Sequence, residues 1–539
     1  MQIRFTKAFM ATHVNLDALI PRQDFDEKLS QPLPTGGTRK ETISANDLAK
    51  GQFFFPSLRK PDFQRETNEW DSNKILDLIE SFLRKDLIPA IILWQSESNL
   101  NFVIDGSHRL SALAAWINDD YGNGVISKAL YDGVIPEEQI EIGDKVRSLI
   151  NKKIGSYADH LLSVSNPEKV KPEIVAQARI LAAVSIQLQW VTGDSNNAEL
   201  SFRKINEQGV PINATEKKIL KARKKPIGIA ARAIIRAGSG NNFYWKHFTP
   251  LSQSALTNTA KEVNNLLFLP KLKNPIKTLD LPIAGKVYSS QSLPITWEFL
   301  RIVNPLDAID ADDSDGSLTL KFLNNCKRVA QLINSDDSGS LGLHPIVYLY
   351  SGSGRHKPAS FYALINFVLA IEKSDKLVQF TCVRKSFEKL LLENDYVVEQ
   401  IVRKSRSAKA GLDSVTEFYQ LCISKLYEKS SIETVLAEIF KMPAFKFVTK
   451  PMVELPTNEE RNFSGPVKSR AYIQSVLPTA PRCGICEGYV HTSSVSIDHI
   501  TDKKHGGDAS SQNAQIVHPF CNSAKDKIMP ALQKWRQQA

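Results

Sequence analysis

The feature that most constrains this chain is a set of two ligand pairs close to its C-terminal end. Cys483 and Cys486 form a Cys-x-x-Cys pair, and after thirty-one intervening residues His518 and Cys521 form a His-x-x-Cys pair. Each spacing lets one tight turn present two soft side chains to a tetrahedral zinc ion. The four residues therefore predict a structural zinc site that pins the enclosed segment.

The enclosed segment predicts a strand and a loop, and a helix is expected after the second pair. Residues 497–500 (IDHI) carry an Asp-His dipeptide between apolar residues and follow a β-favouring valine, which predicts a short strand. The sequence DKKHGGDASS that follows predicts a loop. A helix is expected over 523–538, interrupted or ended at Pro530. These parts would make a zinc-braced ββα-metal unit.

This pattern resembles the HNH endonucleases of the four-ligand zinc type, with His518 in place of one Cys of the usual second pair. The resemblance implies that His499 is the general base for an attacking water. It implies that Asp498 and Asn522 are ligands of a catalytic divalent ion, Mg²⁺ or Mn²⁺, and that the amide of Asn513 holds the base in orientation. The alternative is a zinc knuckle without catalysis. His491 and His505 are expected to be solvated or to contact phosphate.

Length and charge suggest several domains and a polyanionic partner. A chain of 539 residues is expected to form about two to four domains. The formal charge is +10 and the isoelectric point is near 9.0, which favours binding to nucleic acid. Basic residues concentrate between 217 and 225, although a solvated helix face would give the same pattern. They are Lys217, Lys218, Lys221, Arg223, Lys224 and Lys225.

The cysteines outside the zinc motif indicate a reducing compartment. Cys326, Cys382 and Cys422 lie in apolar or helical contexts and are predicted to be reduced core thiols, which favours the cytoplasm. The first residues are too polar for the core of a signal peptide. The apolar run 361–371 is far shorter than the roughly twenty residues that cross a bilayer, so it predicts a buried helix and no membrane partner.

Taken in order, the chain predicts an α+β protein of several domains. We expect an irregular N-terminal arm over 1–42, an α+β domain over 43–225 and a mostly helical domain over 226–440. A proline-rich linker over 441–470 would then lead into a nuclease domain over 471–539.

Within the α+β domain, one turn has the features of an anion site. The predicted strand 101–105 ends in Asp105-Gly106-Ser107-His108-Arg109, which opens an apolar helix. A glycine turn at a helix N-terminus presents free N–H groups and the positive end of the helix dipole, and Arg109 adds a donor for phosphate. A structural turn with a surface arginine is the alternative.

The order of motifs around this turn resembles the ParB/sulfiredoxin-like N-terminal domain of GmrSD-type restriction proteins. The sequence matches that family's pattern at Gln64-Arg65, Asp105-Gly106, Arg109, Phe202, Asn206, Gly209 and Pro211, and departs from it at Ser107-His108 and Ile212. The resemblance implies a nucleotide site, most simply for a nucleoside triphosphate, at Gln64, Arg65, the turn 105–109 and Asn206. Sulfiredoxin chemistry is excluded because Ser107 replaces the redox cysteine. No GxxxxGK[ST] string occurs, so a Walker-type site is not supported.

Together these motifs predict a DNA endonuclease of the restriction and anti-phage type, with HNH cleavage controlled by a ParB-like sensor. Phage or modified DNA is the expected substrate, and a homo-oligomer or a partner defence protein is compatible with the family. The competing hypothesis is a non-catalytic DNA-binding protein with a ParB-like clamp and a structural zinc module. Asp498 and Asn522 discriminate between the two, because a zinc-only module does not need them beside His499.

Overall fold

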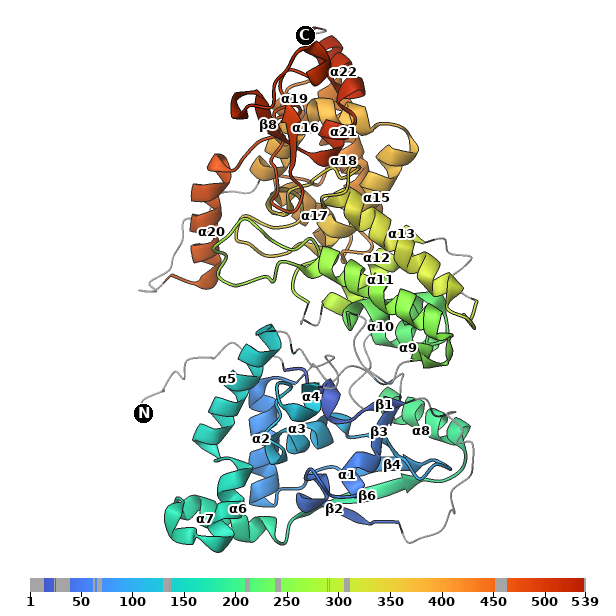
Figure 1. Cartoon of the computed structure of the whole chain (residues 1–539), viewed down its shortest axis with the longest axis vertical. Coiled ribbons are helices and arrows are strands. Elements are labelled where there is room, and N and C mark those ends of the chain that lie inside the picture. The colour runs from blue at the N-terminus through green and yellow to red at the C-terminus, as the bar shows by residue number, and fades with distance from the viewer. Residues whose placement is uncertain are drawn as a thin grey trace. The chain divides into compact units, whose positions relative to one another are not determined.

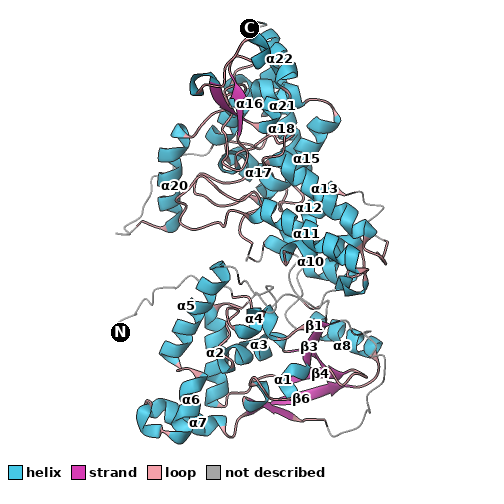
Figure 2. Cartoon of the chain, in the orientation of Figure 1, coloured by secondary structure: helices cyan, strands magenta, loops and turns pink. Residues whose placement is uncertain are grey.

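The computed structural model describes residues 14–23, 25, 39–61, 64, 70–128, 135, 137–208, 214–237, 244–287, 289, 291–304, 311–450 and 463–537 (Figure 1). They form an α+β protein in which helices predominate and the strands lie in one mixed sheet and one hairpin, as predicted (Figure 2). The chain divides into two compact units. Unit 1 contains Met1–Lys224, Ser239–Gln253 and Tyr288–Ser290, and unit 2 contains Lys225–Gly238, Ser254–Val287 and Gln291–Ala539. In the part of the chain that the structure describes, no helix combines the length and apolar character of a membrane span.

Unit 1 is built on a mixed sheet with the strand order β1-β3-β5-β4-β6-β2. Strands β1 and β3, β3 and β5, and β4 and β6 pair in parallel, whereas β4–β5 and β2–β6 are antiparallel. The bounds are β1 (Arg22–Gln23), β2 (Thr42–Ser44), β3 (Leu58–Pro61), β4 (Ile91–Gln95), β5 (Asn101–Asp105) and β6 (Ser185–Val191). The predicted strand over 101–105 therefore corresponds to β5.

Helices α2 (Ser72–Arg84) and α3 (Ser107–Ile117) form the centre of the core of unit 1. Helix α2 buries Ile75, Ile79 and Phe82, which are spaced along one helical face, and Asp71 caps its first turn. Helix α3 is buried at every residue except Arg109. The remaining helices of this unit are α1 (Phe54–Ser57), α4 (Val125–Lys128), α5 (Glu137–Lys153), α6 (Tyr157–Ser165), α7 (Pro172–Leu181), α8 (Ser195–Gln208) and α9 (Ala214–Lys221).

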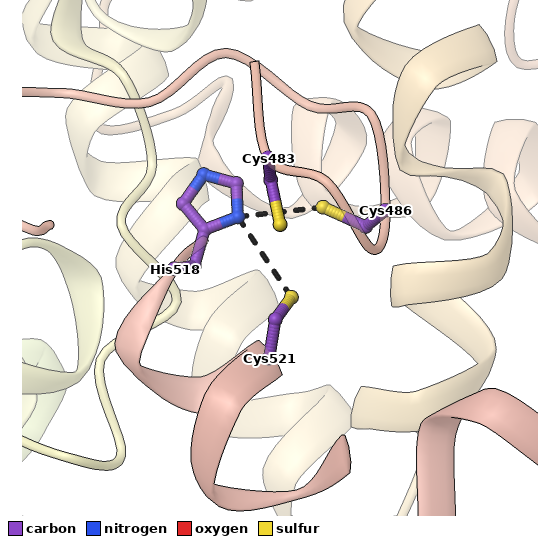
Figure 3. A group of neighbouring side chains, drawn as sticks. All are labelled: Cys483, Cys486, His518 and Cys521. Carbon is purple, nitrogen blue, oxygen red and sulfur yellow. Dashed lines mark hydrogen bonds between the residues drawn. The ribbon is translucent and has the colours of Figure 1, made fainter. Parts of the chain in front are cut away.

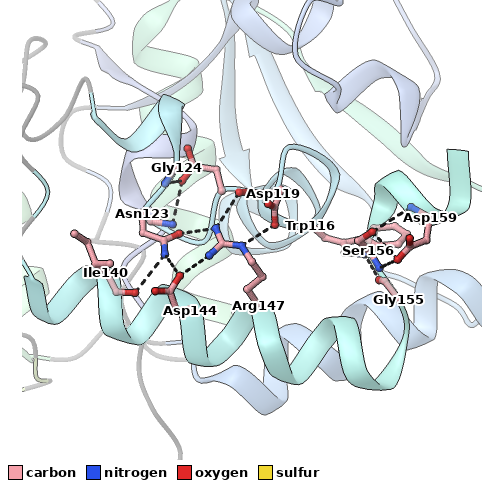
Figure 4. Close-up of polar contacts among 12 residues, drawn as sticks. Trp116, Asp119, Asn123, Gly124, Ile140, Asp144, Arg147, Gly155, Ser156 and Asp159 are labelled. Atoms are coloured by element: carbon pink, nitrogen blue, oxygen red, sulfur yellow. Dashed lines mark hydrogen bonds and ion pairs between the residues drawn. The ribbon is translucent and has the colours of Figure 1, made fainter. Parts of the chain in front are cut away.

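A polar network joins α5 to the turn that follows α3 (Figure 4). The guanidinium of Arg147 donates to Asp119 Oδ1 at 2.8 Å, to Asp144 Oδ1 at 2.7 Å and to Asn123 Oδ1 at 2.7 Å. The same guanidinium also donates to the carbonyl of Asp119 at 3.0 Å, and a charged donor fork shared among these four oxygens fixes α5 against the turn after α3.

The expected N-terminal arm is part of unit 1 where it is described. Val14, Leu16, Leu19 and Ile20 are buried in the same core cluster as α2 and α3. Strand β1 also lies in this segment and pairs with β3. The prolines and glycines of 1–42 favoured an irregular arm, but the apolar residues between 14 and 20 complete the core instead.

Unit 2 is a helical assembly that ends in the zinc-motif region. Its helices are α10 (Pro226–Ile235), most of α11 (Pro250–Phe268), α12 (Ser292–Val303), α13 (Ser317–Ile333), α14 (Pro345–Tyr348), α15 (Pro358–Lys373), α16 (Leu377–Glu393), α17 (Tyr396–Lys404), α18 (Leu412–Tyr427), α19 (Ile432–Ile439) and α20 (Gly465–Val476). Helix α15 contains the apolar run 361–371 and is largely buried, as predicted. Cys326, Cys382 and Cys422 are free and buried, which confirms their prediction as reduced core thiols.

The C-terminal part contains the hairpin β7 (Ser496–His499) and β8 (Ala514–Val517), followed by α21 (Pro519–Ser523) and α22 (Lys525–Gln537). The predicted strand 497–500 is β7. The predicted break at Pro530 is wrong, because Pro530 lies inside α22 and the helices separate at Ala524. Ile528 and Leu532 are buried on the two sides of Pro530, so packing offsets the lost hydrogen bond.

The predicted linker and nuclease domain are not separate from the helical region in unit 2. Phe445 and Val448, in the first part of 441–470, are buried, and residues 451–462 lie outside the described part of the chain. One core cluster joins Cys382 of α16 to the two cysteines of the first zinc turn and to α22. The zinc-motif region is therefore packed onto the helices as one body.

Candidate functional site

The four predicted zinc ligands converge in a buried cluster (Figure 3). The ligand atoms of Cys483, Cys486, His518 and Cys521 all lie within 4.8 Å of one another, and all four residues are buried. The N–H of Glu487 bonds the carbonyl of Cys483 at 2.9 Å, which closes the first turn. His518 and Cys521 start α21, so one turn of helix sets the second pair.

The ring of His518 is oriented for coordination through Nδ1. Its Nε2–H donates to the carbonyl of Tyr489 at 3.0 Å, and Nδ1 lies 3.3 Å from Cys486 Sγ and 3.8 Å from Cys521 Sγ. A hydrogen bond to the distal ring nitrogen is the usual way in which proteins fix the tautomer of a metal-bound histidine.

Ionisation of the thiols also suits a metal. Contacts with the Cys486 and Cys521 thiols hold the pKa of Cys483 far below its ordinary value, whereas burial raises the pKa of Cys486. Three sulfur donors and one imidazole in a closed, buried set fit a tetrahedral structural zinc ion.

The hairpin beside this cluster carries the predicted catalytic dipeptide. Strands β7 and β8 are antiparallel, with Asp498 opposite Gln515 and His499 opposite Ala514. Asp498 is 7% exposed and His499 is half-buried, because successive side chains of a strand point to opposite faces. The predicted base His499 and the carboxylate of Asp498 thus lie on opposite faces at the end of one strand.

Two residues that the motif did not identify complete the surroundings of Asp498. The ammonium of Lys525 lies 2.9 Å from Asp498 Oδ2 and 2.6 Å from Asp502 Oδ1, and it also donates to the carbonyl of His499. Burial lowers the pKa of Lys525, but its bonds to Asp502 and Asp498 raise the pKa by more, so the net pKa is above the ordinary value. The bond to Lys525 in turn lowers the pKa of Asp502. Three oxygen atoms therefore converge on one cationic position. No local pattern marks Lys525, because its partners Asp498 and Asp502 lie more than twenty residues before it in the sequence.

Asn522 joins α21 to β7 next to this position. Its amide nitrogen donates to Ser496 Oγ at 2.7 Å and to the carbonyl of Ile497 at 3.4 Å. Together with Asp498 and Asp502, it offers oxygen donors of the kind that a hard divalent cation prefers. The chemistry of these oxygen donors suits such an ion, and Asp502 is an addition to the predicted ligands.

Asn513 has a different set of partners from the one expected. Its Oδ1 accepts from the N–H of Thr501 at 2.7 Å, and its Nδ2 donates to the carbonyls of Thr501 at 3.0 Å and Asp508 at 2.7 Å. These bonds brace the loop after His499. Any effect of Asn513 on the imidazole therefore passes through the backbone, where the N–H of Ile500 bonds the carbonyl of Asn513 at 2.8 Å.

The two other histidines of this region differ in environment. His491 is 2% exposed; its Nδ1 lies 2.9 Å from Asn334 Nδ2 and its Nε2 lies 3.1 Å from Asp280 Oδ1. The expectation that His491 is solvated or contacts phosphate is wrong, since it belongs to the buried contact with the helices. His505 is exposed, as expected.

In unit 1, the turn at 105–109 uses its polar groups internally. Gly106 has φ of +93°, and a Cβ atom there would lie 2.4 Å from Ile91 Cδ1, so the turn requires glycine. Arg109 donates to Asp105 Oδ2 at 2.6 Å and to the carbonyl of Pro89 at 2.9 Å. Its guanidinium, expected to bind phosphate, braces the turn against the start of β4.

The other predicted pocket residues lie near this turn only in part. Gln64 Nε2 donates to Ser107 Oγ at 3.0 Å, and the ring of His108 stacks on Trp70 with centroids 6.0 Å apart. Asn206 lies on α8 with its side chain outside the described part, and Arg65 lies outside it altogether.

Sequence reasoning missed two buried cations beside Gln64. Arg22 contacts the carbonyl of Gln64 and pairs with Asp17 at 2.6 Å, and Lys60 lies 2.9 Å from the same carboxylate. Arg22 lies in the segment expected to be irregular, so no local pattern marked it. Both cations are held by the one buried carboxylate of Asp17.

The zinc-ligand cluster, the β7–β8 hairpin and the following helix have the organisation of a ββα-metal nuclease. Comparison with family models agrees: residues 483–527 match the HNH endonuclease model, and residues 45–223 match the N-terminal domain of the GmrSD restriction endonuclease. The two matched segments occur in the order of a GmrSD-type fusion. Comparisons with curated proteins and with solved structures gave no match.

Proposed function

We propose that this protein is a metal-dependent DNA endonuclease of the restriction type that acts in anti-phage defence in the cytoplasm. The observation that carries the proposal is the pairing of Asp498 and Asp502 on the Lys525 ammonium at the end of β7, with His499 next in that strand and Asn522 bonded to its Ser496. A zinc module without catalysis would not need this arrangement. The net charge of +10 supports binding to the DNA backbone.

In this proposal the residues of the hairpin have separate roles. His499 takes a proton from the attacking water, and the carboxylates of Asp498 and Asp502 with Asn522 hold a divalent ion, Mg²⁺ or Mn²⁺. The ion, when bound, stabilises the negative charge that develops on the phosphate and the leaving oxygen. Lys525 keeps the two carboxylates together and adds positive charge next to the substrate phosphate. Asn513 fixes the loop that follows His499 at the end of β7.

We further propose that residues 43–225, together with the packed segment from Val14, form a ParB-like sensor for a nucleotide or for DNA. The support is the start of α3, where Gly106 and Ser107 present helix N–H groups at the positive end of the helix dipole. Arg109 then acts as a brace, and Gln64 positions Ser107. Hydrolysis of a nucleoside triphosphate is not required by this geometry.

The experiment is digestion of plasmid and modified phage DNA by the purified full chain, with and without Mg²⁺ and with each nucleoside triphosphate in turn. Cleavage should require the divalent ion in protein that retains zinc. Cleavage that persists after selective removal of the second metal would contradict the proposed site. Full zinc content and tight DNA binding without cleavage under every condition would instead favour the non-catalytic clamp.

A further inference from the structure

Two charged residues of the helical region reach the zinc-ligand cluster from outside the HNH match. Arg384 and Glu388 lie one turn apart on α16, with side chains 2% and 0% exposed and Nε 2.7 Å from Oε1. A buried ion pair recovers the cost of its desolvation only when its remaining donors and acceptors are also satisfied. The partners of this pair therefore indicate what it holds in place.

Glu388 is bonded to the peptide that orients the histidine ligand. Its Oε2 accepts from the N–H of Tyr489 at 2.7 Å, and the carbonyl of the same Tyr489 accepts from His518 Nε2 at 3.0 Å. Its Oε1 accepts from the hydroxyl of Tyr348 at 3.1 Å. One residue of backbone thus links the carboxylate of α16 to the imidazole that faces the three thiols.

Arg384 closes the other side of the cluster. Its Nη2 donates to the carbonyl of Gly342 at 2.8 Å, its Nη1 donates to the carbonyl of Leu341, and Nη1 lies 3.2 Å from His518 Nδ1. The approach is close: a Cβ at Gly342 would lie 2.6 Å from His518 Cδ2, and a Cβ at Gly488 would lie 2.5 Å from Arg384 Nε. Both glycines leave room for this contact.

The charges of the cluster also favour a neighbouring cation. Zinc bound by three thiolates and a neutral imidazole carries one net negative charge, and the guanidinium of Arg384 is buried beside it. Hydrogen bonds to the groups that surround a metal orient its ligands and tune their basicity.

We propose that Arg384 and Glu388 of α16 are positioning residues for the zinc site, so that the helical region sets the metal affinity of the nuclease. The inference rests on the proposed zinc site. It predicts that loss of the Glu388 carboxylate weakens zinc binding about 10- to 100-fold, as is typical for residues that support metal ligands. The effect would come from a residue 130 positions before His518 in the chain.

The test is chelator competition for zinc in the full chain, comparing wild type with Glu388→Gln. Lys389→Gln is the matched control, because Lys389 is the next residue of α16 and its side chain is 63% exposed. We expect about 10- to 100-fold weaker zinc binding in Glu388→Gln, none in the control, and an altered visible spectrum of the Co²⁺-substituted variant. Equal competition curves and equal Co²⁺ spectra for Glu388→Gln and wild type would overturn the proposal.

A second variant covers the case in which Glu388→Gln does not fold. Tyr348→Phe removes one hydrogen bond to Oε1 and no charge, so it should fold and release zinc several-fold more readily than wild type. An unchanged zinc affinity in folded Tyr348→Phe, together with unfolded Glu388→Gln, would make the pair purely structural and overturn the proposal. Wild type that holds no zinc at all would instead contradict the zinc site itself.

Discussion

The turn at Asp105–Arg109 and the hairpin at β7–β8 both place charged side chains at the end of a strand, yet they use them in opposite ways. In the turn, Arg109 donates hydrogen bonds to Asp105 and to the carbonyl of Pro89, so its guanidinium is bonded within the protein. At the hairpin, Asp498 and Asp502 converge on one cationic position. In the turn one guanidinium pairs with one carboxylate, whereas at the hairpin two carboxylates share the single ammonium of Lys525, and in the proposed function a divalent ion binds there as well.

The largest expected effect is loss of the zinc site. Cys483→Ala or Cys521→Ala should abolish zinc binding and unfold the C-terminal part of unit 2, because structural zinc contributes about 10 to 16 kcal/mol of folding free energy in small domains. Zinc stoichiometry and thermal melting measure both. Cys382→Ala is the control, since Cys382 packs in the same core cluster but is not a ligand. Wild-type zinc content and melting in the ligand variants would contradict the site.

The second prediction tests whether the Lys525 ammonium competes with a metal ion for the carboxylates of the hairpin. Lys525→Gln should increase the affinity of the full chain for Mn²⁺ several-fold, because it removes the ammonium between Asp498 and Asp502. Binding of Mn²⁺ in the absence of DNA, followed by electron paramagnetic resonance, reports this directly. Lys527→Gln, an exposed position of the same helix, should leave the affinity unchanged. If Mn²⁺ binds equally to both variants, Lys525 does not compete for the carboxylates.

The third prediction tests whether the turn of unit 1 is structural. Arg109→Ala should destabilise unit 1 by about 1.5 to 3 kcal/mol, since it removes charged hydrogen bonds to Asp105 and Pro89. The measurement is chemical denaturation, with Arg84→Ala as the control because Arg84 is 60% exposed. Nucleotide binding, measured by calorimetry, should fall only together with stability. If Arg109→Ala keeps its full stability but loses nucleotide binding, Arg109 contacts the nucleotide and is not only a structural brace.

The sequence predicted the parts of the site that lie within one short segment. Each of the two ligand pairs lies on one turn, so the spacing within each pair was enough to predict the four ligands, which are Cys483, Cys486, His518 and Cys521. The strand with Asp498 and His499 also depends on a local pattern. Asp502 and Lys525 escaped notice because their role appears only when the loop and α22 meet in space.

The predictions that failed depended on contacts between segments that are distant in the sequence. His491 looks like a surface residue in its own segment, but Asn334 and Asp280 bury it from elsewhere in unit 2. The break expected at Pro530 was removed by packing of its neighbours, and the arm before residue 43 was drawn into the core of unit 1. These outcomes depend on which distant segments pack against each other, and the periodicity of a segment gives no information on its tertiary contacts.

The central claim is that the hairpin hydrolyses DNA with His499 as the base, and one measurement tests it most directly. Single-turnover cleavage of plasmid DNA by the full chain with Mg²⁺ should be about 10²- to 10⁴-fold slower in His499→Ala than in wild type. Zinc content and DNA affinity should be equal in the two proteins, because His499 is not a zinc ligand. Cleavage by His499→Ala at the wild-type rate would contradict the assignment.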